Sequence, residues 1–283
     1  MPMELRWGDR TYVMGIINIT ADSFSGDGLA SAGRDTDAVV VAALDLARGF
    51  VEAGAELLDV GAESSRPPRA YGDHPAVDAE TEAGLAVPVV RALATEFGER
   101  AVISIDTSKE SVARAALEAG ATMVNDVWAA RRDPGTADAA AAAGAHLVLM
   151  HNQDDITYPA GVFAAVAGWL REAVDAAIGR GVSRGRLIVD PGIGFGKGTN
   201  ENLELLRRLA ELKAELGGMP LLVGASRKRF LGELLGGTDP HDRIEGTAAT
   251  VALAVAAGAD IVRVHDVAHM ARVRTVSDAV IRR

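Results

Sequence analysis

The chain has 283 residues, of which 48% are hydrophobic and 24% are charged, and its formal net charge is −10. This composition is typical of a globular protein with enough apolar material for a large core. The acidic balance excludes a global basic field for nucleic acid or anionic membranes, so an anionic small substrate would need a local cluster of cations or a metal. Cysteine is absent, which excludes disulfides, thiolate chemistry and cysteine-bound metal centres.

The N-terminal segment carries no recognisable targeting signal. Residues 1–7 lack the basic-then-apolar pattern of a secretion signal, and no apolar run reaches transmembrane length. A cytoplasmic location is therefore expected. Residues 4–7 and 11–13 flank Gly8-Asp9, and this pattern predicts a short N-terminal hairpin that covers one end of the fold.

One unit recurs along the chain. An alanine-rich helix ends near an Ala-Gly-Ala sequence, and a short apolar run that ends in a polar residue follows. The glycine is typical of a helix C-terminus, and the apolar run is typical of a parallel strand buried on both faces. The pattern predicts strands near residues 13–18, 57–60, 102–106, 123–126, 146–150, 187–190, 220–224 and 261–265. It predicts helices near residues 37–52, 79–97, 109–119, 136–143, 162–180, 200–216, 244–257 and 267–281.

The alternation of eight strands with eight helices favours a closed (β/α)8 TIM barrel, an α/β fold that suits this length. An open doubly wound sheet is the alternative, but no Gly-x-Gly-x-x-Gly sequence follows the first strand. No linker or low-complexity segment divides the chain, so residues 1–283 are expected to form one domain.

Polar residues end nearly every predicted strand. In such barrels the site lies at the C-terminal ends of the strands, so these residues are expected to meet. They are Asn18, Asp59 with Glu63, Asp106, Asn125 and Asp126, His151, Asp190, Ser226 to Arg229, and Arg263 to Asp266. Residues 190–197, a glycine-rich loop, would let the backbone approach a ligand closely.

The chemistry of these residues divides into two groups. Asp106, Asn125, Asp190 and Lys228 combine acceptors and donors, which suits a flat heterocycle with N–H groups on one edge and a carbonyl on another. The second group would hold a phosphate or pyrophosphate. Arg263 and His265 stand two apart on one strand and face the same side, Arg66 could join them, and Asn18 offers a neutral oxygen suited to Mg²⁺.

Common hydrolase and nucleotide motifs are missing. The sequence has no Gly-x-Ser-x-Gly elbow and no His-Glu-x-x-His. The Gly196-Lys197 pair does not begin a P-loop, because Gly198 follows where Ser or Thr is needed.

Seven segments, taken in order, resemble the dihydropteroate synthase family of pterin-binding enzymes. They span nearly the whole chain, and seven in the family's order form a specific pattern. They are residues 14–25, 59–67, 105–107, 124–126, 190–197, 224–230 and 263–266.

The resemblance implies a (β/α)8 barrel, usually a homodimer, that acts in folate biosynthesis. Family members are transferases that join 6-hydroxymethyl-7,8-dihydropterin diphosphate to 4-aminobenzoate and release pyrophosphate. The implied mechanism is a dissociative substitution at the pterin methylene, with Mg²⁺ as cofactor. The last helices, about residues 244–281, would form the dimer interface.

The resemblance also implies a role for individual residues. By the family pattern, the pterin is held by Asp106, Asn125, Asp190, Phe195 and Lys228. The diphosphate is held by Asn18, Arg66, Arg263 and His265, with Asn18 also the metal ligand. The aminobenzoate pocket is lined by Phe24, Ser65, Arg66, Pro67, Lys228 and Arg229.

Several positions depart from the family pattern. Gly26-Asp27 moves an expected loop acid by one place, and Trp128-Ala129-Ala130 replaces a usual Ser-Gly-Gly. Two alternatives therefore stand beside the synthase: a pterin-dependent methyltransferase of the corrinoid type, and a catalytically impaired pterin-binding paralogue. The cationic segments 226–228 and 263–265 argue against the methyltransferase, which has no diphosphate to bind.

Overall fold

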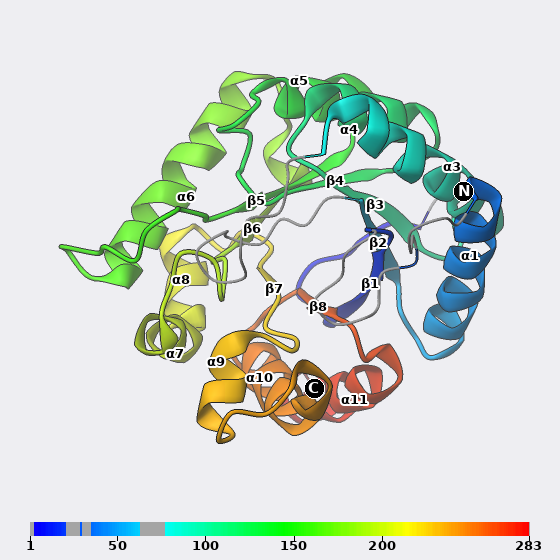
Figure 1. The fold of residues 1–283 in the computed structure, drawn as a ribbon. Helices are drawn as coiled ribbons and strands as arrows, with labels where there is room; N and C mark the ends of the chain where they lie inside the picture. The colour runs from blue at the N-terminus through cyan, green and yellow to red at the C-terminus, as the bar shows by residue number, and fades with distance from the viewer. Residues whose placement is uncertain (1–2, 21–28, 30–34, 63–76, 283) are drawn as a thin grey trace.

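A ring of eight parallel strands forms the centre of the molecule (Figure 1). The computed structural model describes residues 3–20, 29, 35–62 and 77–282. The strands are β1 (Tyr12–Asn18), β2 (Leu57–Gly61), β3 (Val102–Asp106), β4 (Met123–Asp126), β5 (His146–Met150), β6 (Leu187–Asp190), β7 (Leu222–Val223) and β8 (Ile261–Val264). Their order around the sheet is β6-β5-β4-β3-β2-β1-β8-β7. The predicted TIM barrel is thus confirmed.

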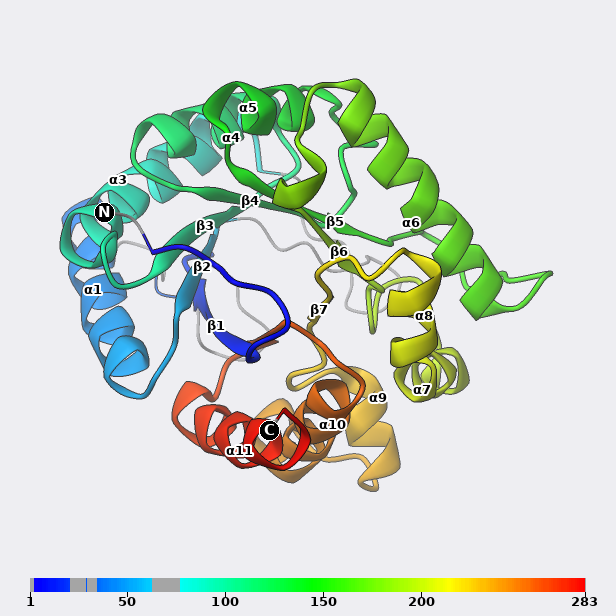
Figure 2. The same ribbon diagram turned by 180° about the vertical axis from the view of Figure 1, so that it is seen from behind.

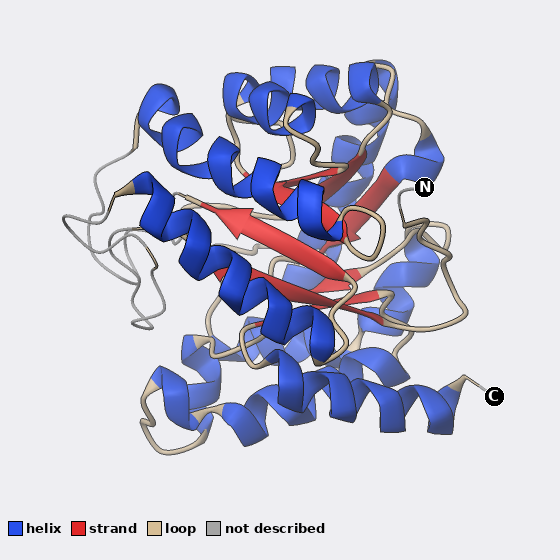
Figure 3. Cartoon of the chain, turned by 90° about the vertical axis from the view of Figure 1, so that its right-hand side faces the viewer, coloured by secondary structure: helices blue, strands red, loops and turns tan. Residues whose placement is uncertain are grey.

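Helices cover the outside of this ring, and the strands lie between them (Figure 3). The α-helices are α1 (Thr36–Glu52), α3 (Ala79–Phe97), α4 (Glu110–Glu118), α5 (Gly135–Ala143), α6 (Val162–Gly179), α7 (Thr199–Arg207), α8 (Leu209–Glu215), α9 (Arg229–Leu234), α10 (Ile244–Ala256) and α11 (Val267–Ile281). Two short 3₁₀ turns are η1 (Arg184–Arg186) and η2 (Pro240–Asp242). Within the described ranges, no helix combines the length and the apolar character needed to cross a membrane.

The predicted N-terminal hairpin is wrong. Residues 3–11 form no strand. The segment instead runs across the end of the barrel without pairing to another segment as a strand, and it is coloured dark blue in Figure 2. Leu5 joins the apolar interior of the barrel, and the Trp7 ring meets His146 edge-on at 5.9 Å between centroids. Side-chain burial therefore holds this segment where backbone pairing was expected, and its covering role is retained.

The barrel interior follows from the two-residue period of its strands. Side chains at alternate positions face the barrel axis, and those toward the N-terminal ends of the strands are apolar. This inner cluster contains Leu5, Tyr12, Met14, Leu57, Val102, Met123, Val148, Ile188, Leu222 and Ile261. Two residues further along β2, β4, β6 and β8 the same inward positions hold Asp59, Asn125, Asp190 and Arg263. The interior therefore changes from apolar to charged toward the C-terminal ends of the strands.

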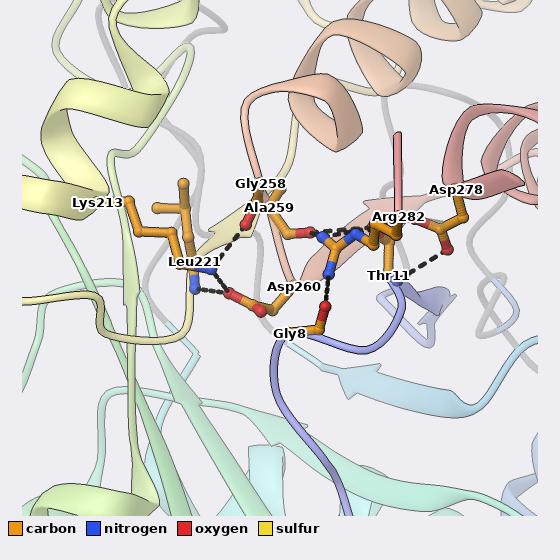
Figure 4. A network of polar contacts seen from close by, with 9 residues as sticks. All are labelled: Gly8, Thr11, Lys213, Leu221, Gly258, Ala259, Asp260, Asp278 and Arg282. Atoms are coloured by element: carbon orange, nitrogen blue, oxygen red, sulfur yellow. Dashed lines mark hydrogen bonds and ion pairs between the residues drawn. The ribbon is translucent and has the colours of Figure 1, made fainter. Parts of the chain in front are cut away.

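The barrel closes between β6 and β7 through a single parallel bridge, Val189 to Leu221. Beside this seam, buried Asp260 accepts hydrogen bonds from the Leu221 N–H at 2.8 Å and from Lys213 Nζ at 2.7 Å (Figure 4). Lys213 Nζ also donates to the Gly258 carbonyl. Polar contacts around β7 and β8 thus support the seam where the ladder is shortest.

Candidate active site

The predicted strand-end residues converge at one end of the barrel. Strand register brings them level, because Gly61 pairs with Asp106 and Asp106 pairs with Asn125 across adjacent strands. Met150 pairs with Asp190 in the same way on β5 and β6. Asp106, Asn125 and Asp190 are all buried. The barrel therefore holds a ring of buried polar groups at the C-terminal ends of its strands.

Arg263 lies at the centre of this ring. Its Nε donates to Asp59 Oδ2 at 2.7 Å and its second guanidinium nitrogen donates to Asp106 Oδ2 at 2.9 Å. Asn125 Nδ2 donates to the same Asp59 oxygen at 2.9 Å. One cation thus joins β2, β3 and β8, and Asp59 orients both Arg263 and Asn125.

Burial sets the charge states of these groups. It raises the pKa of Asp106 to about 8, against the opposing effect of the Arg263 charge. Burial also raises the pKa of Asp190, although Lys228 and the Gly192 N–H favour its ionised form. For Arg263 burial lowers the pKa, but Asp59 and Asp106 outweigh it and the net direction is upward. The site therefore holds a permanent cation between acids that lack full solvation.

The loop after β6 approaches its neighbours so closely that glycine is required. At Gly192, where φ is +67°, an added Cβ would lie 1.9 Å from the His151 carbonyl oxygen. At Gly194, where φ is +82°, it would lie 2.7 Å from Lys228 Cδ. The Gly192 N–H donates to Asp190 Oδ1 at 2.7 Å. This fold of the loop fixes the Asp190 carboxylate.

Lys197, at the end of this loop, points inward and is buried. Its Nζ donates to the carbonyls of Gly192 at 2.9 Å and Phe195 at 2.8 Å, and it lies 2.9 Å from His151 Nδ1. Burial lowers the pKa of Lys197 well below its usual value and the pKa of His151 to about 3. Lys197 therefore holds the loop of residues 190–197 in place through hydrogen bonds to two of its carbonyl groups.

Lys228 reaches the same loop from the other side. It precedes α9, its Nζ donates to the Ile193 carbonyl, and it lies 4.4 Å from the centroid of the Phe195 ring. A lysine at this distance from an aromatic face makes a cation–π contact. The neighbouring Arg229 is exposed and pairs with Glu233 at 3.3 Å. The structure thus brings Lys228, Phe195 and Asp190 together, while Arg229 lies at the surface.

The end of β8 meets the loop after β7. The His265 N–H donates to Ser226 Oγ at 3.2 Å, and His265 Nδ1 lies 3.1 Å from the same hydroxyl. Asn18, at the end of β1, accepts hydrogen bonds at its Oδ1 from the Thr20 N–H and the Thr20 hydroxyl. Asn18 is therefore tied to its own strand end, and His265 to the loop that carries Lys228.

Four predicted residues, Phe24, Ser65, Arg66 and Pro67, lie outside the described residues, as do Glu63 and Gly26-Asp27. Two contributors were not assigned a role from the sequence. Asp59 was noted only as a strand end, although its position two residues after Leu57 places it inside the barrel. Lys197 enters the sequence analysis only as part of the pair that does not begin a P-loop, and no sequence signal indicates that its side chain turns inward.

Comparisons with known proteins agree with this geometry. A family model described as pterin binding enzyme matches residues 14–265. The dihydropteroate synthase of Synechocystis sp. is 41% identical over 279 residues, covering 96% of this chain and 91% of its own length.

Two solved structures are similar over nearly their whole length. A dihydropteroate synthase from Clostridium difficile, crystallised in the presence of pteroic acid, has a TM-score of 0.90 and 39% identity, with 99% of this chain and 100% of that chain covered. The Xanthomonas albilineans enzyme in complex with 7,8-dihydropteroate has a TM-score of 0.83 and 41% identity, with 96% and 94% covered. The chain therefore belongs to the pterin-binding enzymes and, among them, to the dihydropteroate synthases, the transferases of folate synthesis.

Proposed function

We propose that this chain joins 6-hydroxymethyl-7,8-dihydropterin diphosphate to 4-aminobenzoate and releases pyrophosphate. The observation that carries this proposal is the buried polar ring at the strand ends. Asp106, Asn125 and Asp190 offer hydrogen-bond partners for the edges of a flat heterocycle, and Arg263 stands beside them as a cation. Family membership supports the same assignment.

The residues of the ring suggest how the pterin is held. A carboxylate can accept two parallel N–H bonds from one edge of the pterin, and Asp190 fits this role because its other contacts fix its orientation. Asp106 and Asn125 would hold the opposite edge. Lys228 would donate to the pterin carbonyl while the Phe195 ring covers the same side.

The proposed reaction needs no covalent nucleophile. The C–O bond between the pterin methylene and the diphosphate breaks first, and its electron pair leaves with the diphosphate oxygen. The electron-rich pterin stabilises the methylene cation, and the aminobenzoate nitrogen then bonds to that carbon and loses a proton. Arg263 and His265 would stabilise the charge that develops on the leaving group. Phe24, Ser65, Arg66, Pro67, Lys228 and Arg229 remain the predicted lining of the aminobenzoate pocket.

Mg²⁺ fits this site only together with substrate oxygens. No three acidic, histidine or cysteine side chains of the described ranges are grouped to hold a metal. Asn18 Oδ1 is the proposed protein ligand, and a bound ion would replace a hydrogen bond that this oxygen now accepts from Thr20. Mg²⁺ prefers oxygen ligands and commonly bridges to phosphates. When bound, it would neutralise charge on the departing diphosphate.

A pyrophosphate-release assay tests the proposal. Release that requires pterin diphosphate, 4-aminobenzoate and Mg²⁺ together, and that a sulfonamide blocks, would support the synthase. Pterin binding without turnover would identify an impaired paralogue. Methyl transfer to a corrinoid, with no pyrophosphate release, would identify the methyltransferase.

Replacing Lys228 tests the site assignment. We expect Lys228→Ala to lower kcat/KM by about 100-fold or more, because a charged hydrogen bond is worth roughly 1.5–3 kcal/mol and a cation–π contact is lost with it. Steady-state kinetics and pterin titration measure the change. Arg91→Ala, on the exposed face of α3, is the control. Wild-type activity in the Lys228 variant would refute the assignment.

We further propose that residues 1–283 act as one domain and assemble as a homodimer in the cytoplasm. Exposed apolar side chains on the last helices support the dimer: Leu253 on α10, and Val276, Val280 and Ile281 on α11. A second copy of the chain would bury this face. Sedimentation of wild type and of Val280→Glu would distinguish a dimer through this surface from a monomer.

A further inference from the structure

Arg227 has a left-handed backbone, with φ at +58°. This conformation is unfavourable for any residue that has a Cβ, and long side chains rarely adopt it. Only Ala129 and Ala130 share it among the non-glycine residues that the structure describes. A strained backbone that persists must be held by its surroundings, and such strain is concentrated at functional sites.

Four contacts hold Arg227 in place. Its Nε donates to Asp266 Oδ2 at 3.0 Å and its Nη2 to Asp266 Oδ1 at 2.6 Å, which makes a two-pronged ion pair. Its N–H donates to Thr247 Oγ1 at 3.2 Å, and its carbonyl accepts from Arg243 Nη1 at 2.8 Å. The ion pair is well shielded, with side-chain exposures of 12% and 20%. A bidentate pair of this kind fixes direction as well as distance.

The surroundings are built around this turn. Buried Arg243 reaches the Arg227 carbonyl because Gly232 on α9 leaves space, and a Cβ there would lie 2.5 Å from the Arg243 guanidinium. Asp266 is the residue before α11, but its side chain caps no N–H of that helix. Its carboxylate is therefore committed to Arg227. Figure 1 shows α9, α10 and α11 side by side outside β7 and β8.

The neighbours of both partners face the two halves of the proposed substrate. Lys228, directly after Arg227, reaches Ile193 and the Phe195 ring on the pterin side. Ser226, directly before Arg227, bonds to His265 on the diphosphate side, and His265 directly precedes Asp266. The ion pair thus joins the loop after β7 to the loop after β8 at the point where the two groups meet.

We propose that Arg227 is a positioning residue whose ion pair with Asp266 sets the relative placement of Lys228 and His265. Neither member of the pair needs to touch the substrate. Loss of the pair lets the strained turn relax. This relaxation displaces both Lys228 and Ser226 and weakens the binding of both the pterin and the diphosphate. This inference rests on the proposed function, because it assigns the two sides of the turn to the two halves of that substrate.

Three single variants test the pair. Asp266→Asn keeps the size of the side chain and removes its charge. Arg227→Gly removes the pair and the backbone strain, whereas Arg227→Ala removes the pair and keeps the strain. Glu96→Gln is the matched control, because Arg48 and Glu96 form an exposed two-pronged pair, at 2.8 Å for each bond, on α1 and α3.

Binding of 6-hydroxymethylpterin and of pyrophosphate with Mg²⁺ is measured separately for the full-length protein, alongside kcat, KM and urea unfolding. We expect Asp266→Asn and Arg227→Gly each to weaken both ligands about 10-fold, while Glu96→Gln weakens neither. The Arg227→Gly protein should unfold at a higher urea concentration than the Arg227→Ala protein, while its affinities for both ligands should be as low. A double variant Arg227→Gly/Asp266→Asn should lose no more affinity than the worse single variant.

The outcomes separate the inference from the proposed function. Unchanged affinities in the Arg227 and Asp266 variants, with wild type binding both ligands, would overturn the inference and leave the function standing. Losses of affinity that simply multiply in the double variant would also overturn it, because the two residues would then act independently. If wild type binds neither ligand, the proposed function fails and the inference fails with it.

Discussion

At the scale of single residues, the site is organised by what burial does to its acids. Asp106 is buried beside Arg263, and the guanidinium alone does not restore the solvation that the carboxylate loses, so its pKa stands at about 8. A ligand that offers N–H donors would supply the missing hydrogen bonds. Ligand binding and proton release should therefore be linked at this residue.

This linkage predicts a pH dependence of pterin binding. Below about pH 8 the free enzyme holds a proton on Asp106, and a pterin that bonds to the ionised carboxylate must displace it. We expect affinity for 6-hydroxymethylpterin to rise from pH 6 to pH 8 and to level off above that, with close to one proton released at pH 7. Calorimetry in two buffers of different ionisation enthalpy measures the release. Asp106→Asn should abolish it, and a binding enthalpy independent of buffer would contradict the prediction.

At the scale of elements, the strands could be predicted from the sequence and some helices could not. Short apolar runs, nearly all followed by a polar residue, located all eight strands, because both faces of a barrel strand are buried and its C-terminal end lies where barrel sites form. Helix α9, Arg229–Leu234, was missed because six residues are too few to show a helical period. The predicted helix at 200–216 is interrupted at Arg208, which lies between the end of α7 and the start of α8.

Side-chain placement at the site was partly predictable for the same reason. The two-residue period places Asp106, Asn125, Asp190 and Arg263 inside the barrel, so their proximity follows from the strand pattern. Contacts between loops do not follow from any local pattern. The inward turn of Lys197 and the pairing of Arg227 with Asp266 depend on how separate loops fold against one another.

The turn after β4 shows a local conflict between sequence and backbone. Ala129 and Ala130 have φ of +51° and +57°, in the left-handed region that favours glycine. The turn is held by Asp126, which accepts from the N–H groups of Trp128 at 2.8 Å and Ala130 at 3.0 Å, and the Trp128 ring lies 3.5 Å from the Arg132 guanidinium carbon. These contacts compensate for a backbone that alanine disfavours.

Glycine at this turn should stabilise the protein. We expect Ala130→Gly to raise the free energy of unfolding by about 0.5–1 kcal/mol, because the relief of left-handed strain exceeds the added freedom of the unfolded chain. Urea denaturation measures the change. The control is Ala176→Gly on the exposed face of α6, which should lower stability by about 1 kcal/mol. Changes of the same sign at both positions would show that the turn stores no strain.

At the scale of the whole molecule, the candidate site lies at one end of the barrel, and the contacts that hold the barrel together dominate the other end. Buried polar groups occupy the C-terminal ends of the strands, and the apolar interior and the N-terminal segment fill the other end. Closure is weakest at the seam between β6 and β7, where β7 contains only two residues. Asp260 and its partners lie beside this seam, away from the site, whereas the Thr11 N–H bond to Asp278 joins the start of β1 to α11 (Figure 4).

This separation predicts that the seam can be weakened without changing the chemistry. Asp260→Ala leaves the buried Leu221 N–H unpaired and removes the carboxylate partner of Lys213. Removing one partner of a buried pair costs about 3–5 kcal/mol, and Lys213, whose side chain is 22% exposed, can recover part of this from solvent. We therefore expect the free energy of unfolding to fall by about 2–4 kcal/mol, with Asp260→Asn less affected because its amide oxygen still accepts both bonds.

Activity per folded molecule should stay at the wild-type level in both Asp260 variants, because the seam contacts lie at the end of β7 and β8 opposite to Lys228 and Arg263. Urea unfolding and steady-state kinetics on the same samples measure the two quantities together. Stability as high as wild type in Asp260→Ala would show that the bridge between Val189 and Leu221 closes the barrel by itself. A fall in kcat at full occupancy of the folded state would show instead that the seam controls the geometry of the strand ends, and that the two ends of the barrel are not independent.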